Sequence, residues 1–334
     1  MKSDSFQGRR VLVTGGAGFL GSNLVLRLVS AGAQVTVLDS MVPELGGNAF
    51  NLSPLSAGSI RQEHADLRDR SALLRIVRGF DLIFNLAGNI SHQDSMANPS
   101  LDLELNVTGH VNLLEVCRLQ NREAVVVFSS TRQIYGVPQY LPVTESHPIY
   151  PTDVNGINKY AAEQYHLLYH RVHGLKTACL RLTNSYGPRQ LIRHSRQGFV
   201  GWFLNRAMTG NPIQLYGGGQ QRRDFNYVDD VCDALLTAAV SDACLGQALN
   251  LSGEIASLEQ VAQHLIDCSG RGTLVKIPFP VEQKKIDIGD YFGNSDRFQE
   301  ATGWRPRVGL AAGLKKMVEY YREFLPHYLS ESGA

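Results

Sequence analysis

A glycine-rich turn near the N-terminus constrains this chain more than any other segment. The run Arg10–Thr14 has the length and apolar content of a buried strand, and Gly15, Gly18 and Gly21 follow it. Glycines at such a turn let the backbone approach a pyrophosphate, and the helix that begins there presents its N–H groups to it. A second strand, Gln34–Asp39, ends in a carboxylate that can accept hydrogen bonds from ribose hydroxyls and repel a 2'-phosphate. The segment therefore predicts a dinucleotide site that favours NAD over NADP.

The rest of the first half alternates short apolar runs with amphipathic stretches, as in a parallel sheet covered on both faces. Further strands are expected at 59–64, 82–86, 124–129 and 177–182. After about Gly187 the alternation gives way to pieces punctuated by glycine and proline. We therefore predict an α/β fold with a Rossmann-type doubly wound parallel sheet in residues 1–186 and a smaller C-terminal α/β substrate lobe in residues 187–334. The boundary is approximate, segments are expected to interleave, and a ligand cleft is expected between the two parts.

Composition excludes several classes of protein. The 334 residues contain 32 Lys and Arg against 31 Asp and Glu, and the basic residues form no block along the chain. This argues against a protein that binds nucleic acid or an anionic membrane. No apolar run approaches the 18 residues of a membrane span, and the N-terminus lacks the apolar stretch of a secretory signal. The five cysteines are scattered without a C-x-x-C pair, so we expect no metal site, no disulfide framework and a cytoplasmic location.

Ordered motifs along the chain, from Arg10 to about Glu323, resemble the extended short-chain dehydrogenase/reductase family, in particular its NAD-dependent nucleotide-sugar epimerase and dehydratase branch. The motifs are TGGAGFLGS at 14–22, DL at 66–67, NLAG at 85–88, Asn106, SST at 129–131 before IYG at 134–136, KYAAE at 159–163, RLTNSYGPR at 181–189, RDFNYVDD at 223–230 and GWRP at 303–306. The resemblance implies bound NAD, a nucleotide diphosphate sugar as substrate, and a homodimer formed through helices near 101–119 and 158–173.

The resemblance also implies roles for individual residues. Those expected to bind the cofactor are Gly15, Gly18, Phe19, Leu20, Gly21, Asp39, Asp66, Leu67, Leu86, Ala87, Gly88, Asn106, Ser129 and Lys159. Those expected to bind the substrate are His92, Thr131, Asn184, Arg189 and Arg223. Thr131 would hydrogen-bond the sugar hydroxyl that is oxidised. Lys159 would bind the nicotinamide ribose and lower the pKa of a neighbouring tyrosine through its charge.

That tyrosine is expected four residues before Lys159, where this chain has Asn155. A spacing of four places Asn155 and Lys159 on one side of a helix, so Thr131, Asn155 and Lys159 remain the expected catalytic set. An amide cannot act as a general base near neutral pH. The departure therefore leaves open which group accepts the hydroxyl proton.

Three accounts of the missing tyrosine remain open. In the first, Asn155 holds a water that relays the proton. In the second, another titratable group replaces the phenol, with His92, Asp94 and Tyr135 as the candidates. In the third, the chain binds NAD and a nucleotide sugar without turning the sugar over.

The two residues after Thr131 indicate which reaction of this branch the chain would catalyse. Dehydratases of this branch carry an acidic residue there, because eliminating water requires an acid and a base, whereas this chain has Arg132 and Gln133. Arg132 could instead contact an anionic sugar substituent. We therefore expect NAD-dependent epimerisation of a nucleotide diphosphate sugar, at C4 through a transient 4-keto sugar. The alternatives are a nucleotide-sugar dehydratase or oxidoreductase, and a non-catalytic binding protein.

Overall fold

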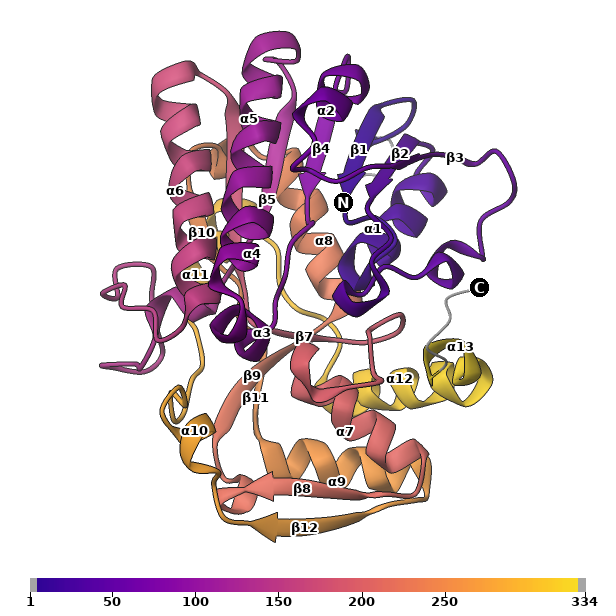
Figure 1. Ribbon diagram of the computed structural model, residues 1–334, viewed down its shortest axis with the longest axis vertical. Helices are drawn as coiled ribbons and strands as arrows, with labels where there is room; N and C mark the ends of the chain where they lie inside the picture. The colour runs from indigo at the N-terminus through magenta and orange to yellow at the C-terminus, as the bar shows by residue number, and fades with distance from the viewer. Residues whose placement is uncertain (1–4, 330–334) are drawn as a thin grey trace.

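A seven-stranded parallel sheet forms the centre of the computed structural model, which describes residues 5–329 (Figure 1). The strand order is β3-β2-β1-β4-β5-β6-β10. The strands are β1 (Arg10–Thr14), β2 (Gln34–Asp39), β3 (Ile60–His64), β4 (Leu82–Asn85), β5 (Val125–Thr131), β6 (Lys176–Leu182) and β10 (Ala248–Asn250). The predicted α/β fold with a doubly wound sheet is confirmed, and the six expected strands are present within two residues of their expected ends.

Helices cover both faces of this sheet (Figure 1). One face carries α1 (Phe19–Ser30) and α8 (Val228–Ala239), and the other carries α2 (Arg70–Ile76), α5 (Gly109–Gln120) and α6 (Val154–His173). Because side chains alternate along a strand, Val11 and Val13 pack in the core on the α1 side, whereas Leu12 packs with Leu113 on the other. This two-sided burial explains why the strands are nearly continuous apolar runs.

A smaller lobe lies at one end of the sheet. It contains a three-stranded sheet of β11 (Glu254–Ser257), β9 (Arg222–Tyr227) and β7 (Asn184–Tyr186), and a parallel pair of β12 (Thr273–Ile277) and β8 (Pro212–Tyr216). Its helices are α7 (Phe199–Met208), α9 (Leu258–Ser269), α10 (Val281–Lys284), α12 (Leu310–Phe324) and α13 (Pro326–Leu329). The remaining helices are α3 (His92–Ala97), α4 (Pro99–Leu103) and α11 (Asp296–Thr302), and a single π-helical turn, η4 (Glu104–Thr108), joins α4 to α5.

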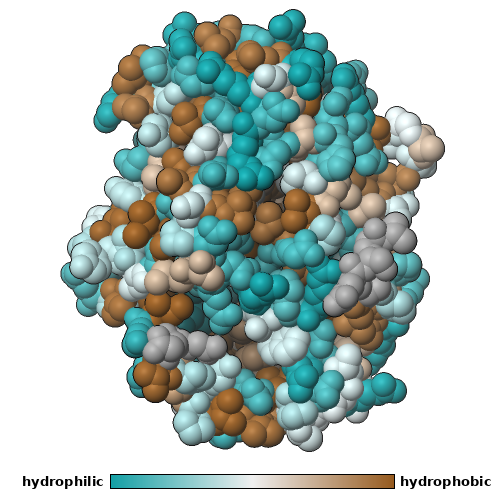
Figure 2. All heavy atoms as spheres, viewed as in Figure 1, coloured by the Kyte–Doolittle hydropathy of each residue, from teal (hydrophilic) through white to brown (hydrophobic). Residues whose placement is uncertain are grey.

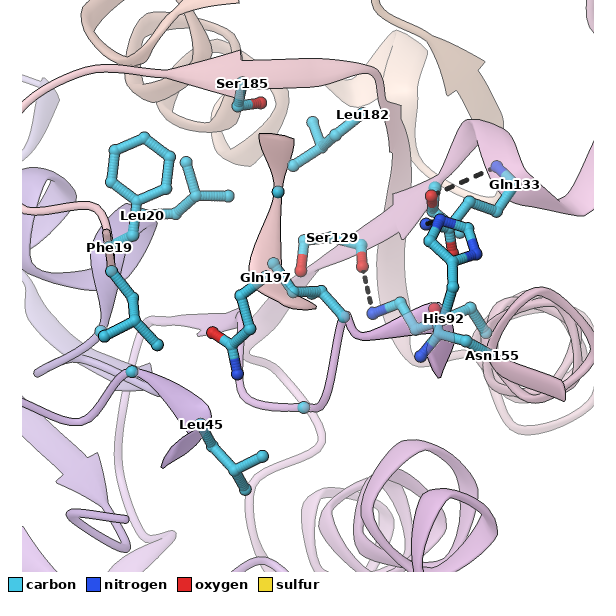
Figure 3. Close-up of a pocket in the computed structure, with 18 of the residues that line it drawn as sticks. Phe19, Leu20, Leu45, His92, Ser129, Gln133, Asn155, Leu182, Ser185 and Gln197 are labelled. Carbon is cyan, nitrogen blue, oxygen red and sulfur yellow. Dashed lines mark hydrogen bonds between the residues drawn. The ribbon is translucent and has the colours of Figure 1, made fainter. Parts of the chain in front are cut away.

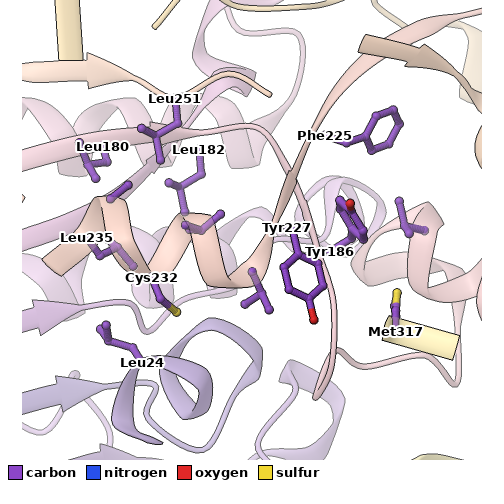
Figure 4. Packing of buried hydrophobic residues seen from close by; sticks show 14 of the residues in the cluster. Leu24, Leu180, Leu182, Tyr186, Phe225, Tyr227, Cys232, Leu235, Leu251 and Met317 are labelled. Carbon is purple, nitrogen blue, oxygen red and sulfur yellow. The ribbon is translucent and has the colours of Figure 1, made fainter. Parts of the chain in front are cut away.

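The two halves of the chain interleave. The segment that carries α8 and β10 returns from the second half to cover and extend the large sheet. One hydrophobic core runs from Leu24 in α1 through Leu180 in β6 to Tyr227 in β9 and Met317 in α12 (Figure 4). The division at residues 186 and 187 stays a prediction, because elements from both sides of it share this core.

Within residues 5–329, no helix has both the length and the apolar content needed to cross a bilayer. On the face shown in Figure 2, apolar and polar side chains are interspersed.

The close packing of α1 on β1 depends on Gly21. A Cβ at this position would lie 2.0 Å from the carbonyl oxygen of Gly15 and 2.7 Å from the Cα of Gly16. Both are backbone atoms, which cannot move aside as the end of a flexible side chain can. The third glycine of the turn is therefore required by helix and strand packing.

We expect Gly21→Ala to lower the free energy of unfolding by about 2 kcal/mol, because the added methyl forces α1 away from the turn. Urea unfolding followed by circular dichroism measures this change. Gly18→Ala is the matched control, since its Cβ would lie 3.3 Å from the same carbonyl oxygen and its φ is −78°. Equal losses in the two variants would contradict the packing argument.

Candidate functional site

A cavity of about 550 Å³ lies at the carboxyl ends of the parallel strands, where the large sheet faces the smaller lobe (Figure 3). The predicted site residues that line it are Gly15, Gly18, Phe19, Leu20, Gly21, Asp39, Asp66, Leu67, Leu86, Ala87, Gly88, His92, Ser129, Thr131, Asn155, Lys159, Asn184 and Arg223. Figure 3 shows Phe19 and Leu20 toward one end, and His92, Gln133 and Asn155 toward the other. The cavity therefore has a glycine-turn end and a His92 end.

The glycine-turn end offers backbone donors. Helix α1 begins after Gly18 without a side-chain cap and without an acidic residue in its first turn, so its first N–H groups are available to a ligand. Gly15 has a φ of +66°, and a Cβ there would lie 2.9 Å from the backbone of Ala87. A helix N-terminus with these properties suits the pyrophosphate of a dinucleotide.

Asp39 is held in place at the same end. One of its carboxylate oxygens accepts a hydrogen bond from the backbone N–H of Ala17 at 2.9 Å, and the other accepts from that of Met41 at 2.8 Å. A carboxylate oxygen has more than one acceptor position, so both can still receive a ribose hydroxyl. Asp66 also lines this end, and its hydrogen bonds from Arg68 lower the pKa of its carboxyl despite partial burial. The residues at this end fit NAD.

The chain after β4 forms a wall of the cavity and is fixed by Thr14. The Thr14 hydroxyl donates to Asn85 Oδ1 at 3.0 Å and accepts from the N–H groups of Leu86 and Ala87 at 3.1 and 3.2 Å. These bonds hold the Leu86–Gly88 wall in position.

At the His92 end, Lys159 is almost fully buried. Its Nζ donates to the carbonyl oxygen of Ser129 at 2.7 Å and lies 4.4 Å from the centroid of the Phe128 ring. Burial lowers the pKa of Lys159 from 10.5 to about 8, although the carboxylate of Asp102 opposes the shift. Thr131, at the end of β5, accepts a hydrogen bond from Gln133 N–H at 3.2 Å, which leaves its own O–H free to donate.

Asn155 lines the cavity, but its amide nitrogen points into the protein. It donates to the carbonyl oxygen of Asn89 at 2.8 Å and to Asp102 Oδ2 at 3.2 Å. The side chain is only 1% exposed. Asn155 is therefore held within a buried polar cluster, and whether it stands where relatives have a tyrosine stays a prediction.

Two predicted site residues lie outside the cavity lining. Asn106 is fully buried, and its amide bonds the backbone N–H and carbonyl oxygen of Asn89, so it supports the wall from behind. Arg189 has a φ of +69° and donates to Asn23 Oδ1 at 2.8 Å, with its guanidinium over the Tyr320 ring. It lines a separate small hollow, and its expected contact with the substrate stays a prediction.

Two arginines do face the cavity. Arg223 Nη1 donates to the carbonyl oxygens of Arg222 and Gly289, and Arg223 Nη2 lies 3.7 Å from Asp287. Burial, and next the charge of Arg132, lower the pKa of Arg223 to about 10. The Arg132 guanidinium lies 4.9 Å from the Tyr291 ring centroid, and it has neither a hydrogen bond nor an ion pair with any described side chain, residues 282 and 283 not being among them.

The other proton-acceptor candidates are placed differently from His92. The Tyr135 hydroxyl is buried, donates to Asn250 Oδ1 at 2.7 Å and accepts from Arg181 at 2.6 Å. Asp94 forms an ion pair with Arg196 at 3.1 Å and does not line the cavity. His92 alone among the three candidates lines the cavity.

Sequence reasoning missed two residues beside His92. Asp153, the N-cap of α6, bonds His92 Nδ1, and Gln133 bonds His92 Nε2 at 2.5 Å. An aspartate just before a helical pattern is a recognisable cap signal. It does not reveal a partner 61 residues away.

No cluster of three or more His, Cys, Asp or Glu side chains suited to a metal ion occurs among the described side chains, which are those of residues 5–329 except 282 and 283.

Comparison with known proteins gives a family match across most of the chain. Residues 11–251 match the NAD dependent epimerase/dehydratase family. The UDP-glucose 4-epimerase of Mycolicibacterium smegmatis is 34% identical, with 94% of this chain and 98% of that protein covered, and the CDP-paratose 2-epimerase of Salmonella typhi is 31% identical, with 93% and 98% covered. The structure of UDP-glucose 4-epimerase from Thermotoga maritima with UDP-glucose superposes with a TM-score of 0.86 at 31% identity, covering 95% and 99% of the two chains.

The lowered pKa of Lys159 predicts a pH-dependent contribution to stability. Between pH 8 and 10.5 the unfolded chain binds the Lys159 proton more tightly than the folded chain, so this contribution rises with pH. Relative to Lys159→Met, the wild-type free energy of unfolding should therefore increase by about 3 kcal/mol between pH 7 and pH 10.5. Urea unfolding at several pH values measures the difference. Lys176→Met, at a half-exposed lysine paired with Glu123, is the control, and its free energy of unfolding should differ from that of the parent by a nearly constant amount across this pH range. A constant difference for Lys159→Met would refute the lowered pKa of Lys159.

Proposed function

The chain belongs to the NAD dependent epimerase/dehydratase family, and from that membership we propose that it epimerises the sugar of a nucleotide diphosphate sugar at C4. The observation that carries the proposal is that Thr131 and Lys159 line the same cavity as the glycine turn and Asp39. A ligand held by one end of this cavity can present a reactive ring to the side chains of the other. The UDP-glucose 4-epimerase relatives support the choice of reaction.

The residues around the glycine turn would hold NAD, with the α1 N-terminus at the pyrophosphate and Asp39 at the adenosine ribose. Bound NAD supplies an acceptor for the hydrogen that the sugar carbon loses with its electron pair and later regains. Thr131 would orient the hydroxyl on that carbon, and Lys159 would hold the nicotinamide ribose. Asn184, whose amide bonds the Asp224 carbonyl oxygen, and Arg223 would bind the diphosphate.

The side chains after Thr131 favour epimerisation over dehydration. Arg132 and Gln133 both line the cavity, where elimination of water would require an acid. The buried Lys159 argues against a protein that only binds, because an amine with a strongly lowered pKa is typical of functional sites.

Arg132 favours a sugar that carries an acid group. It follows Thr131 directly, it lines the cavity, and it has no ion-pair partner among the side chains that the structure describes, which are those of residues 5–329 except 282 and 283. A guanidinium binds a carboxylate through two parallel hydrogen bonds. Nucleotide-linked uronic acids are therefore the second class of substrate that we propose, beside neutral hexoses.

We also propose a cytoplasmic homodimer. Exposed apolar side chains lie along α4, α5 and α6, and a second copy would cover them. They include Leu101, Leu103, Leu119, Tyr165, Leu168 and Val172. The five cysteines are all free thiols, as a reducing compartment would keep them.

Incubation with NAD and a panel of UDP-, GDP-, CDP- and dTDP-linked hexoses and uronic acids in deuterated water should yield a C4 epimer of unchanged mass. The hydrogen leaves and returns within the cavity, so no deuterium enters the ring. Mass spectrometry and NMR identify the product. Loss of water would indicate a dehydratase, inversion at another carbon would correct the position, and absence of any product would refute catalysis.

Arg132→Met should reduce kcat/KM for uronic acid substrates at least tenfold while changing that for hexoses less than threefold, because only the acid loses a charged partner. Steady-state kinetics on both classes provide the measurement. Arg223→Gln and Arg223→Met are the comparison variants. They should lower kcat/KM equally for both substrate classes, because both classes carry the diphosphate. An equal effect of Arg132→Met on both classes would contradict a role at the sugar.

A further inference from the structure

His92 and Asp153 form a hydrogen-bonded pair at the His92 end of the cavity. Asp153 Oδ1 accepts a hydrogen bond from Gly156 N–H at 2.8 Å and so caps α6, while Asp153 Oδ2 bonds His92 Nδ1. The Asp153 side chain is 3% exposed, whereas that of His92 is 38% exposed. The carboxylate is therefore shielded from water, and the imidazole is open to the cavity.

The hydrogen-bond pattern assigns the tautomer of the ring. Burial would raise the pKa of Asp153, but the hydrogen bond and charge of His92 lower it overall, so Asp153 is a carboxylate and can only accept. His92 Nδ1 must then carry a hydrogen, and in the neutral ring Nε2 has the free electron pair. Gln133 Nε2 donates to that nitrogen at 2.5 Å, while Gln133 Oε1 is buried without a partner.

Of the proton-acceptor candidates named from the sequence, His92 is the one that lines the cavity. The Asn155 amide is bonded to Asn89 and Asp102, the Tyr135 hydroxyl is bonded on both sides, and Asp94 is paired with Arg196. Gln133, which contacts His92, also donates its backbone N–H to Thr131 Oγ1, so the two side chains share one wall of the cavity.

We propose that His92 is the catalytic base and acid of this enzyme, with Asp153 as the residue that positions it. This proposal rests on the proposed epimerase function. The sugar hydroxyl would lose its proton to His92 Nε2, and NAD held at the glycine-turn end would supply the acceptor for the hydrogen that leaves the same carbon with its electron pair. The sugar would then take both back, so protons and electrons balance. Asp153 holds the tautomer and stabilises the imidazolium, and the amide of Gln133 yields its place on Nε2 to the substrate hydroxyl.

Two variants test the pair. His92→Gln should lower kcat by about 10² to 10⁴ with little change in KM, because only proton transfer is lost. Asp153→Asn retains a good helix cap but places an amide N–H group opposite Nδ1, which forces the hydrogen onto Nε2 and should lower kcat by a similar factor. Asp94→Asn, on the same helix as His92, is the control and should stay within twofold of the parent.

Two further readouts separate catalysis from a structural role. Added imidazole should restore part of the activity of His92→Gly, which a merely structural histidine would not allow. Nitrogen-15 NMR of labelled histidine should show the Nδ1–H tautomer for His92 in the parent and the Nε2–H tautomer in Asp153→Asn. This NMR measurement on the parent decides the tautomer even if a variant fails to fold.

The outcomes distinguish the two proposals. A parent enzyme that turns over no sugar refutes the proposed function. An active parent whose His92→Gln variant keeps activity within threefold refutes only the role of His92, as does an Nε2–H tautomer in the parent or a folded His92→Gly variant that imidazole does not rescue.

Discussion

One buried carboxylate fixes the framework around the His92 end of the cavity. Asp102, in α4, is 1% exposed and accepts hydrogen bonds from four amide side chains. They are Asn89 and Asn106 at 3.1 and 3.0 Å, and Asn155 and Asn158 at 3.2 and 2.9 Å. A buried charge needs such donors, because leaving it unbonded costs several kcal/mol. Since the donors come from the chain after β4, from η4 and from α6, Asp102 fixes α6 relative to the wall of the cavity. The positions of Lys159 and Asp153 follow from it.

This arrangement gives a physical reason for asparagine at position 155. The side chain has an N–H group for Asp102 and is small enough to be enclosed, so the residue contributes to the framework of the site. The proton transfer that we propose lies instead on a different helix, at His92.

Sequence patterns predicted those features of the fold and site that are determined by residues close together in the chain. The glycine turn, the strand ends and Asp39 follow from spacing within about 30 residues, and the structure has them where expected. The pairing of His92 with Asp153 could not be predicted in this way, because it depends on how α3 meets the start of α6. Likewise, Arg189 has a left-handed backbone and lines a separate hollow, and a motif match carries no information about either feature.

The electrostatic character of the site also differs from that of the whole chain. The net formal charge is +1, yet Lys159, Arg132 and Arg223 all face one cavity, and burial lowers the pKa of each. Concentrated positive charge in a low-dielectric cleft attracts anionic ligands even when the surface as a whole is neutral. The overall balance of charge therefore excludes polyanion binding without excluding a small, strongly anionic substrate.

The continuous core described above limits how ligands enter and leave. A protein whose two lobes have separate cores can open like a hinge, but here Leu180, Tyr186 and Tyr227 pack in one cluster that spans both lobes. Opening the lobes as rigid bodies would expose that cluster to water, at a free-energy cost comparable to partial unfolding. We therefore expect exchange to occur through local movement of two segments that line the cavity, residues 45–47 and 286–288. Release of product would then depend on local movement of these two segments and not on separation of the two lobes.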